Sequence, residues 1–380
     1  MVICDVQILS YPLCYTHDGE IIDRWREEQE MIEPELNLRN LDIRLKVVGV
    51  GGGGGSVLWR LAEDRIPNVD LIAVDAAEKN LSGLGNGGIQ TIQIGERLTH
   101  GYGTGGKAEI GEKAAESAED RIRAALAGAN LVFITSCFGG GTGTGAAPAV
   151  ARIAKDMGLL SVAVITTPFQ FEGARKRKAA EAALEKMRGQ VDALVVIRND
   201  NLLRLSEKKT GMAEAFHLAD DVLRRCIRLV SDVVFMTGDI NVDFADLKMI
   251  LRESPSSDAV LGIGESGNGS AADAVRHAVE SPLLDRTLAG AKHAILNIVG
   301  DEGLTMSAAE EAAEYVRQEA GGDLNLIFGT VCDPAMAGRV KAMLVATGFD
   351  EEPSQNPTEQ QKQKTPPAVS PIEIPKWMRQ

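Results

Sequence analysis

Two glycine-rich runs contain the residue types and spacing most able to do chemistry. The first is Gly49-Val-Gly-Gly-Gly-Gly-Gly-Ser56, and the second is Gly139-Gly-Gly-Thr-Gly-Thr-Gly145. Each joins an apolar, strand-like segment to a helix-like one, and backbone amides at such a helix start bind anions. The second run lacks the Lys-Ser or Lys-Thr ending of a P-loop, so amides and threonine hydroxyls must do the binding. Together the runs predict one polyphosphate held from two sides.

The first run alone also fits a dinucleotide-binding fingerprint. Its Gly49-x-Gly51-x-x-Gly54 spacing is followed by Asp75 at the end of the next predicted strand, where a carboxylate can bind ribose. A nicotinamide-dependent dehydrogenase is therefore an alternative, although it leaves the second run without a role. Tight turns without any ligand are a further alternative.

A third constellation is Asn241-x-Asp243-x-x-Asp246, which holds two carboxylates three residues apart beside an amide. Carboxylates of this kind can position or polarise a water during phosphoryl transfer. The alternative is a helix N-terminus enriched in acidic residues, which complements the helix dipole.

The elements around the glycine runs follow a regular alternation from Arg44 onward. Apolar periodicity predicts strands at 45–48, 71–74, 131–135, 161–166 and 193–197, and helices at 56–64, 109–127, 147–156 and 173–188. Strands that are apolar throughout and separated by helices indicate an α/β fold with a parallel sheet covered on both faces.

Further along, the pattern predicts one long central helix and a second, smaller α/β domain. The predicted segments are an extension at 1–43, a phosphate-binding domain at 44–210, the helix at 211–234 and the second domain at 235–349, with strands at 294–299 and 324–328. Residues 350–370 are poor in large apolar side chains and are predicted to be a disordered linker. Residues 371–380 regain hydrophobicity and are typical of a docking peptide.

Composition narrows the classes of function. The chain has 380 residues and a formal net charge of −14, which disfavours binding to nucleic acid or to anionic lipid. Five scattered cysteines favour neither a disulfide framework nor a thiolate zinc site, and a reducing cytoplasm fits them best. No stretch is long and apolar enough for a membrane span.

The run Gly139-Gly-Gly-Thr-Gly-Thr-Gly-Ala-Ala-Pro148 resembles the signature of the FtsZ family, the bacterial tubulin homologues. Further similar motifs are Phe169-Gln-Phe-Glu-Gly173, Asn241-Val-Asp-Phe-Ala-Asp246, Ser281-Pro-Leu-Leu284 and Ile374-Pro-Lys-Trp-Met-Arg379. The resemblance implies a GTP-binding domain at 44–210 and a cytoskeletal GTPase that polymerises into the cell-division ring.

The resemblance also implies the residues that bind GTP or GDP. The phosphates are expected to bind Gly52, Gly53, Gly54, Gly55 and Ser56, and Gly139, Gly140, Gly141, Thr142, Gly143 and Thr144. The ribose is expected to bind Glu172 and Lys176. The guanine is expected to bind Asn199 and Asp220 and to stack on Phe216. A carboxylate suits guanine because it accepts from both N1–H and the 2-amino group.

Catalysis and partners are implied in the same way. The loop with Asn241, Asp243 and Asp246 is expected to enter the nucleotide pocket of the next subunit, and a bound Mg²⁺ is expected to offset the phosphate charge, with no protein ligand assigned to it. The partners are further copies of this chain and membrane adaptors or division proteins that read the tail through Ile374, Pro375, Trp377, Met378 and Arg379. The expected location is the cytoplasm, at the division site.

This sequence departs from the family pattern at three places. Asp75-Ala-Ala-Glu78 replaces the usual Asn-Thr-Asp-Ala, Cys137-Phe138 replaces a Gly-Met pair, and Lys176 replaces an arginine. The first change alters the loop beside the terminal phosphate, and lysine lacks the planar fork of arginine. A divergent paralogue that binds guanine nucleotide but hydrolyses it slowly is the alternative function.

The N-terminal extension leaves two hypotheses open. From Met31 onward, the spacing to the first glycine run resembles the short leader of the family, so Met31 is a candidate start. A genuine extension is the alternative, and mass spectrometry of the native N-terminus distinguishes the two.

Overall fold

The computed structural model describes residues 43–66, 68–205, 212–235, 244–252, 257–281 and 286–349. Several sequence-based predictions lie outside these residues: the N-terminal extension and the Met31 start, Asn241 and Asp243, the linker at 350–370, and the docking peptide at 371–380.

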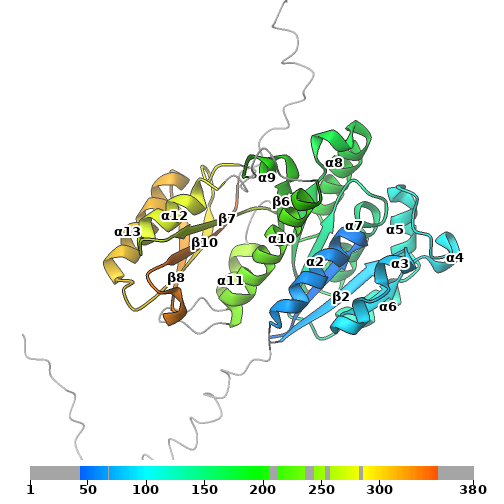
Figure 1. Cartoon of the computed structure of the whole chain (residues 1–380), viewed down its shortest axis with the longest axis horizontal. Helices are drawn as coiled ribbons and strands as arrows, with labels where there is room; N and C mark the ends of the chain where they lie inside the picture. Colours follow the sequence, from blue (N-terminus) through cyan, green and yellow to red (C-terminus); the bar gives the residue numbers. More distant parts are fainter. Residues whose placement is uncertain are drawn as a thin grey trace, which may run out of the picture. The chain divides into compact units, whose positions relative to one another are not determined.

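The strands form one mixed sheet in the order β3-β2-β1-β4-β5-β6-β7-β10-β8-β9 (Figure 1). Their bounds are β1 Leu45–Val50, β2 Val69–Asp75, β3 Gln90–Gln93, β4 Leu131–Cys137, β5 Leu160–Thr167, β6 Ala193–Arg198, β7 Asp258–Ser266, β8 His293–Gly300, β9 Asn325–Cys332 and β10 Val340–Thr347. Neighbouring strands from β3 to β7 are parallel, whereas β10 is antiparallel to both β7 and β8. The predicted α/β class with a mainly parallel sheet is confirmed.

The helices alternate with these strands. Their bounds are α2 Gly51–Asp64, α3 Glu78–Leu81, α4 Glu96–Thr99, α5 Ala108–Glu116, α6 Glu119–Leu126, α7 Thr142–Asp156, α8 Ala174–Arg188, α9 Asn199–Leu205, α10 Met212–Phe235, α11 Phe244–Arg252, α12 Ala271–Val279 and α13 Met306–Ala320. The predicted long helix is α10. Within the described residues, no helix is both long and apolar enough to cross a membrane.

Both faces of the β1 to β6 sheet are buried, as the apolar strands predicted. Alternate residues point to opposite faces, so Val47 and Phe133 join one core while Val48 and Ile134 join the other. The first core contains side chains of α2, α10 and α11, and the second contains side chains of α5, α6, α7 and α8. The sheet is thus the middle layer between two layers of helices.

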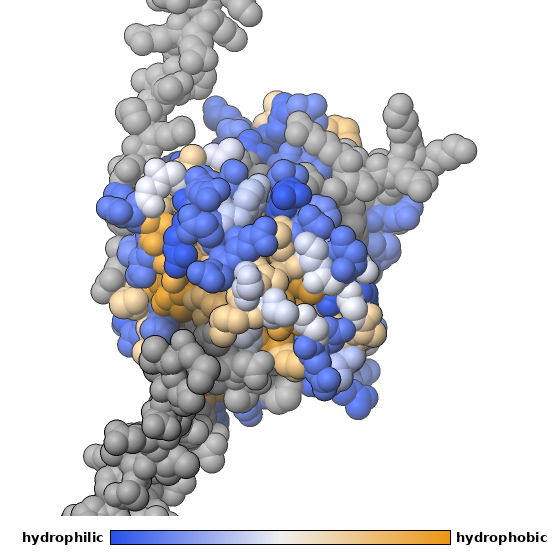
Figure 2. All heavy atoms as spheres, turned by 90° about the vertical axis from the view of Figure 1, so that its left-hand side faces the viewer, coloured by the Kyte–Doolittle hydropathy of each residue, from blue (hydrophilic) through white to orange (hydrophobic). Residues whose placement is uncertain are grey.

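The C-terminal elements extend this sheet through a narrow junction. Strands β6 and β7 pair at only two positions, Leu194 with Asp258 and Val195 with Ala259. Beyond it, α12 and α13 share a third core with β7, β8 and β10. Figure 2 views the molecule from this side and shows apolar side chains among a mainly hydrophilic surface.

One predicted helix is wrong in its extent. The sequence predicts a single helix over 109–127, but the structure has α5 and α6 with a break at Ser117 and Ala118. The Ser117 hydroxyl donates to the Ala114 carbonyl (2.7 Å), and Ala118 leaves the helical conformation at φ −115° and ψ 15°. A serine that bonds back to the backbone competes with the helix ladder, and apolar periodicity does not reveal this.

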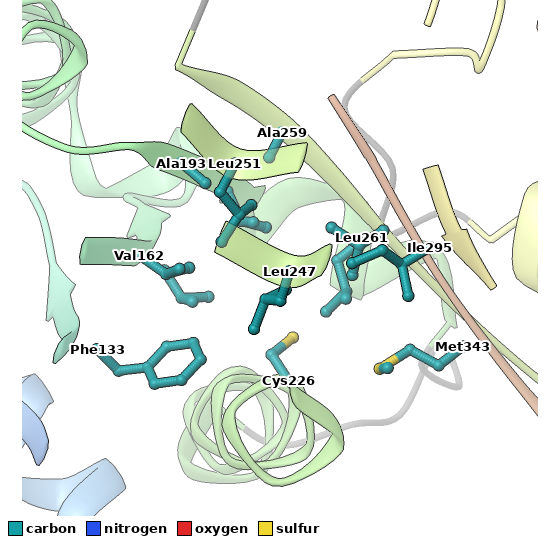
Figure 3. A pocket seen from close by; sticks show the side chains of 13 residues that line it. Phe133, Val162, Ala193, Cys226, Leu247, Leu251, Ala259, Leu261, Ile295 and Met343 are labelled. Atoms are coloured by element: carbon teal, nitrogen blue, oxygen red, sulfur yellow. The ribbon is translucent and has the colours of Figure 1, made fainter. Parts of the chain in front are cut away.

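The first core encloses a small apolar cavity of about 30 Å³ where the two parts of the sheet meet. Figure 3 shows Cys226 of α10, Leu247 of α11 and Met343 of β10 converging on it, with Phe133 and Val162 on the other side. Leu247 is only 3% exposed, so its side chain helps to join α11 to the sheet.

We expect Leu247→Ala to destabilise the fold by about 2–5 kcal/mol, because it removes buried methyl groups and enlarges an existing cavity. Met249→Ala on the same helix is the control, since Met249 is 37% exposed and its truncation should cost less than about 0.5 kcal/mol. Urea denaturation followed by circular dichroism measures both. Equal losses in the two variants would contradict this account of the cavity.

Candidate functional site

The first glycine run forms the start of α2 with no intervening loop. Strand β1 ends at Val50 and α2 begins at Gly51, whose φ of +76° strongly favours glycine. No side chain caps this helix start, and its first turn carries no acidic residue. The first amides of α2 therefore remain available to an anion.

The second glycine run forms the start of α7 in the same way. Strand β4 ends at Cys137, and α7 begins at Thr142 without a side-chain cap. The amide of Gly139 donates to the Thr144 hydroxyl oxygen (2.9 Å), and Thr144 is buried. This threonine therefore holds the loop in shape, whereas Thr142 is only half-buried.

The two runs touch through their backbones. A Cβ atom at Gly51 would lie 2.8 Å from the Gly143 nitrogen, and one at Gly143 would lie 3.2 Å from the Val50 carbonyl oxygen. The contact follows from the topology of the sheet. Strands β1 and β4 are neighbours, and the strand that follows each of them, β2 after β1 and β5 after β4, lies on the opposite side of the pair. Such a switch point, at the carboxyl ends of parallel strands, is where open α/β sheets bind ligands.

A third glycine-rich segment, 101–107, borders the second run, and sequence reasoning missed it. A Cβ atom at Gly141 would lie 2.8 Å from the Lys107 nitrogen, and one at Gly111 would lie 2.6 Å from the Gly141 carbonyl oxygen. The start of α5 is thereby packed against the start of α7. Its signal was present in the sequence, since Gly101, Gly103, Gly105 and Gly106 make a further glycine-rich run.

The loop after β2 carries a second residue that sequence reasoning missed, Asn80. Asp75 is 2% exposed, and its two carboxylate oxygens accept from the Ala77 amide (2.9 Å) and from Nδ2 of Asn80 (2.8 Å). The Asn80 amide stands against the first glycine run, because a Cβ atom at Gly52 would lie 3.1 Å from its Nδ2. Asp75 is therefore engaged within its own loop, which argues against the ribose-binding role that a dehydrogenase requires.

Glu172 and Lys176 lie at the carboxyl end of β5. Glu172 accepts from the Phe169 amide (3.0 Å) and pairs with Nζ of Lys176 (2.9 Å). The Gln170 amide donates to Asp200 (2.9 Å), which brings this segment beside Asn199 at the start of α9. Glu172, Lys176 and Asn199 therefore follow two adjacent strands, β5 and β6.

Asn199 and Phe216 have the exposure expected of ligand-binding groups. Asn199 is 5% exposed, yet its buried Oδ1 has no hydrogen-bond partner among the described residues. A buried polar atom without a partner costs free energy unless a ligand satisfies it. Phe216 is 41% exposed and packs edge-on against Phe169, with ring centroids 5.3 Å apart, so one face of its ring is open.

Asp220, on α10, is a largely buried carboxylate. Its side chain is 13% exposed, and Nε of Arg60 lies 3.6 Å from its Oδ2. Burial raises the pKa of Asp220 to about 6, while the positive charges of Arg60 and His217 act to lower it.

Cys137 lies between the phosphate side and the base side of the site. A Cβ atom at Gly53 would lie 2.5 Å from its Sγ. Burial raises the pKa of the Cys137 thiol to about 11, with a further contribution from the carboxylates of Asp220 and Glu172. The thiol is therefore uncharged at neutral pH, and it fills space beside the first run.

The structure thus brings together the two glycine runs, Glu172, Lys176, Asn199, Phe216 and Asp220, and it places Asp246 elsewhere. Asp246 lies in the first turn of α11. That helix ends where β5 and β6 begin, because Arg252 donates to the Gly158 carbonyl (2.9 Å) and pairs with Asp192 (3.6 Å). The glycine runs lie at the opposite, carboxyl ends of the strands.

No metal centre is evident in the part of the chain that the structure describes. That part contains no group of three or more His, Cys, Asp or Glu side chains placed to hold a metal ion. Asp75, whose Asn80 partner stands against the first run, already accepts two hydrogen bonds.

Comparison with known proteins identifies relatives on both halves of the chain. Residues 44–207 match the Tubulin/FtsZ family GTPase domain, and residues 257–350 match the FtsZ family C-terminal domain. FtsZ from M. jannaschii, solved as an empty dimer, is 36% identical with a TM-score of 0.76, and the match covers 85% of this chain and 92% of that chain.

More distant structures share the fold. CetZ2 from Haloferax volcanii, solved as a GTPγS-bound protofilament, is 23% identical with a TM-score of 0.71, covering 82% of this chain and 95% of that chain. CetZ1 from the same organism, a GDP-bound monomer, is 23% identical with a TM-score of 0.71, covering 82% of this chain and 96% of that chain.

We expect Gly51→Ala to abolish nucleotide binding. The added methyl group meets the Gly143 backbone, and a positive φ costs an alanine about 1–2 kcal/mol. Gly189→Ala is the control, because Gly189 ends α8 with a negative φ and open space around it. Isothermal titration calorimetry with GTP measures binding, and retained affinity in Gly51→Ala would contradict the loop-to-loop contact as the basis of the site.

Proposed function

Because this chain belongs to the tubulin/FtsZ family, we propose that it binds and hydrolyses GTP and polymerises head to tail into the filaments of the cell-division ring. Membership confirms the resemblance noted in the sequence, and with it a cytoskeletal GTPase fold. The observation that carries the proposal is the backbone contact between the two uncapped helix starts, at the switch point of the sheet.

The proposed phosphate site consists of the glycine runs, Ser56 and Thr142. Two uncapped helix starts offer several amides and the positive ends of two helix dipoles to one anion. In a chain with a net charge of −14, this local field is what attracts a triphosphate. The neighbouring segment at 101–107 and the Asn80 amide would close the site around the outer phosphate.

The proposed guanine site consists of Asn199, Asp220 and Phe216. The unpartnered Oδ1 of Asn199 can accept from the base, and the Asp220 carboxylate can accept from N1–H and the 2-amino group together. Adenine offers no such pair of donors on that edge, so the two residues favour guanine. The open face of Phe216 supplies a surface for stacking.

Hydrolysis is proposed to need two subunits. Strands β4 and β5 are seven and eight residues long, so about 23 Å separate the amino ends of these strands from their carboxyl ends. Asp246 precedes Arg252 by six residues, or about 9 Å of helix. Arg252 lies at the amino ends of β5 and β6, away from the glycine runs. Asp246 is therefore too far from its own phosphate site, and it is proposed to position the attacking water, with Asn241 and Asp243, in the next subunit.

Self-association has support from the relatives, since FtsZ from M. jannaschii was solved as a dimer and CetZ2 as a protofilament. Head-to-tail stacking would place the side of one subunit that carries Asp246 against the glycine runs of its neighbour. The division ring and the division site at the inner face of the membrane are proposed from the resemblance of the sequence to the FtsZ family.

A Mg²⁺ ion is proposed to bind mainly through the phosphates of GTP. The described residues do not by themselves fit the ion, because no carboxylate cluster faces the glycine runs and Asp75 is engaged within its loop. When bound, the ion would neutralise phosphate charge.

A slowly hydrolysing paralogue remains the second candidate, and the loop at 75–80 favours it. Asp75 and Asn80 bond to each other in this loop, where the family usually has a threonine hydroxyl and a free aspartate. Without those groups, the terminal phosphate would have fewer contacts than in typical members of the family.

We expect phosphate release to rise steeply above a critical protein concentration, because the site is complete only between subunits. Asp246→Ala should retain GTP-dependent sedimentation but lose phosphate release by about 10²-fold or more, since it removes a group that positions water. Glu310→Ala, an exposed carboxylate of α13, is the control. Release proportional to concentration would contradict the two-subunit site, and negligible release despite assembly would support the paralogue.

The tail is proposed to recruit a membrane adaptor through Ile374, Trp377 and Met378, whose spacing in the sequence suits recognition by a groove. Deleting residues 371–380 should abolish recruitment of the protein to the membrane in cells, while GTP binding and sedimentation of the purified protein stay unchanged. Fluorescence microscopy of the tagged full chain and of the deletion measures recruitment, and unchanged localisation would refute the docking role.

A further inference from the structure

Helices α2 and α10 pack side by side and are joined by two ion pairs. Nε of Arg60 lies 3.6 Å from Oδ2 of Asp220, and NH1 of Arg224 lies 2.9 Å from Oδ1 of Asp64. Helix α2 begins with the first glycine run, and α10 carries Asp220. The first of these pairs therefore connects the phosphate side of the nucleotide site to its base side.

Among the described residues, burial, Arg60 and His217 control the ionisation of the Asp220 carboxyl group. Arg60 approaches from α2, and its guanidinium also hydrogen-bonds Nδ1 of His217, one turn before Asp220 on α10. The carboxylates of Asp220 and Glu172 both act to raise the pKa of the buried Cys137 thiol of β4, which is uncharged at neutral pH. In the described part of the chain, Arg60 and His217 are thus the groups that act to lower the pKa of Asp220, Arg60 more strongly.

We propose that Arg60 is a positioning residue for guanine recognition: it keeps the Asp220 carboxylate ionised and oriented, and so sets the lower pH limit of GTP binding. The proposal rests on the proposed function, in which Asp220 contacts the base. Arg60 itself acts through Asp220 and is not assigned a contact with the nucleotide.

The chemistry of the base explains why ionisation matters. An ionised carboxylate offers two acceptor oxygens, which match the N1–H and 2-amino donors of guanine. A protonated carboxyl group presents a donor in place of one acceptor, so one of the two bonds is replaced by a donor facing a donor. Burial of Asp220 favours this protonated form, and a guanidinium nearby opposes it.

The direction of the pH effect follows. The pKa of Asp220 is raised to about 6, so GTP affinity should fall as the pH drops through that value. Removing the positive charge of Arg60 raises this pKa further, because the cause that lowers it is lost. An opposite charge at this distance typically shifts a carboxyl pKa by about one unit or more, so the fall in affinity should then begin near neutral pH.

The test measures GTP affinity of the full-length protein by calorimetry between about pH 5.5 and about pH 8.5, a range that brackets the titration of Asp220. We expect Arg60→Gln to move the midpoint of the affinity loss upward by about one pH unit, and therefore to weaken binding by about threefold at pH 6.5, approaching about tenfold at the acidic end of the range, while leaving it nearly unchanged at pH 8.5. Arg60→Lys should keep the wild-type midpoint, because it preserves the charge.

Arg224→Gln is the matched control, because it removes the Arg224–Asp64 ion pair between the same two helices, and Arg224 is not among the groups that shift the pKa of Asp220. A purely structural role of Arg60 predicts similar curves for Arg60→Gln and Arg224→Gln, with affinity lowered at every pH. Circular dichroism and gel filtration of each variant at pH 7.5 establish that it is folded.

Asp220→Asn tests the premise with a second ligand. The asparagine amide can donate to the 2-oxo group of xanthine and accept from its N1–H, so this variant should lose GTP binding and gain binding of xanthosine triphosphate. Its residual affinity should also lack the titration near pH 6.

The outcomes separate the inference from the proposed function. An unmoved midpoint in Arg60→Gln, with wild-type protein binding GTP, overturns the role of Arg60 and leaves the GTPase proposal intact. Unchanged GTP binding by Asp220→Asn overturns it as well, because Asp220 then does not read the base. Absence of GTP binding by the wild-type protein at every pH overturns both.

Discussion

The nucleotide site depends on the close backbone contact between the starts of α2 and α7. Both helices begin directly after a strand, and the strands are neighbours, so the two glycine runs meet without side chains between them. Side chains at Gly51 or Gly143 would push the helix starts apart. Glycine is needed here for space and for backbone conformation, and the exposed amides follow from that requirement.

The other parts of the site are arranged around this contact at the ends of successive strands. Strand β2 leads to the Asp75–Asn80 loop, β5 to Glu172 and Lys176, and β6 to Asn199. Helix α10 then returns across the sheet and brings Asp220 to the base side, where it meets Arg60 of α2. In the proposed site, recognition of phosphate and of base is therefore divided between two helices that pack against each other.

Much of the fold could be predicted from the sequence, because apolar strands and glycine runs carry strong local signals. The parallel sheet, the long helix and the position of both glycine runs between a strand and a helix were predicted in this way. The break at Ser117 was not, since a single hydroxyl bonded to the backbone leaves the apolar pattern intact. Asn80 and the segment at 101–107 were also missed, because their role depends on which loops lie together in space. Likewise, the partnership of Arg60 with Asp220 joins residues 160 positions apart and has no local signal.

The location of Asp246 away from the glycine runs determines, in the proposed filament, how many working sites it contains. In the proposed head-to-tail arrangement, each complete site needs the pocket of one subunit and the acidic loop of the next. A filament therefore has one fewer complete site than it has subunits. The subunit with the uncovered pocket retains its triphosphate, so the two ends of the filament differ chemically even though every chain is identical.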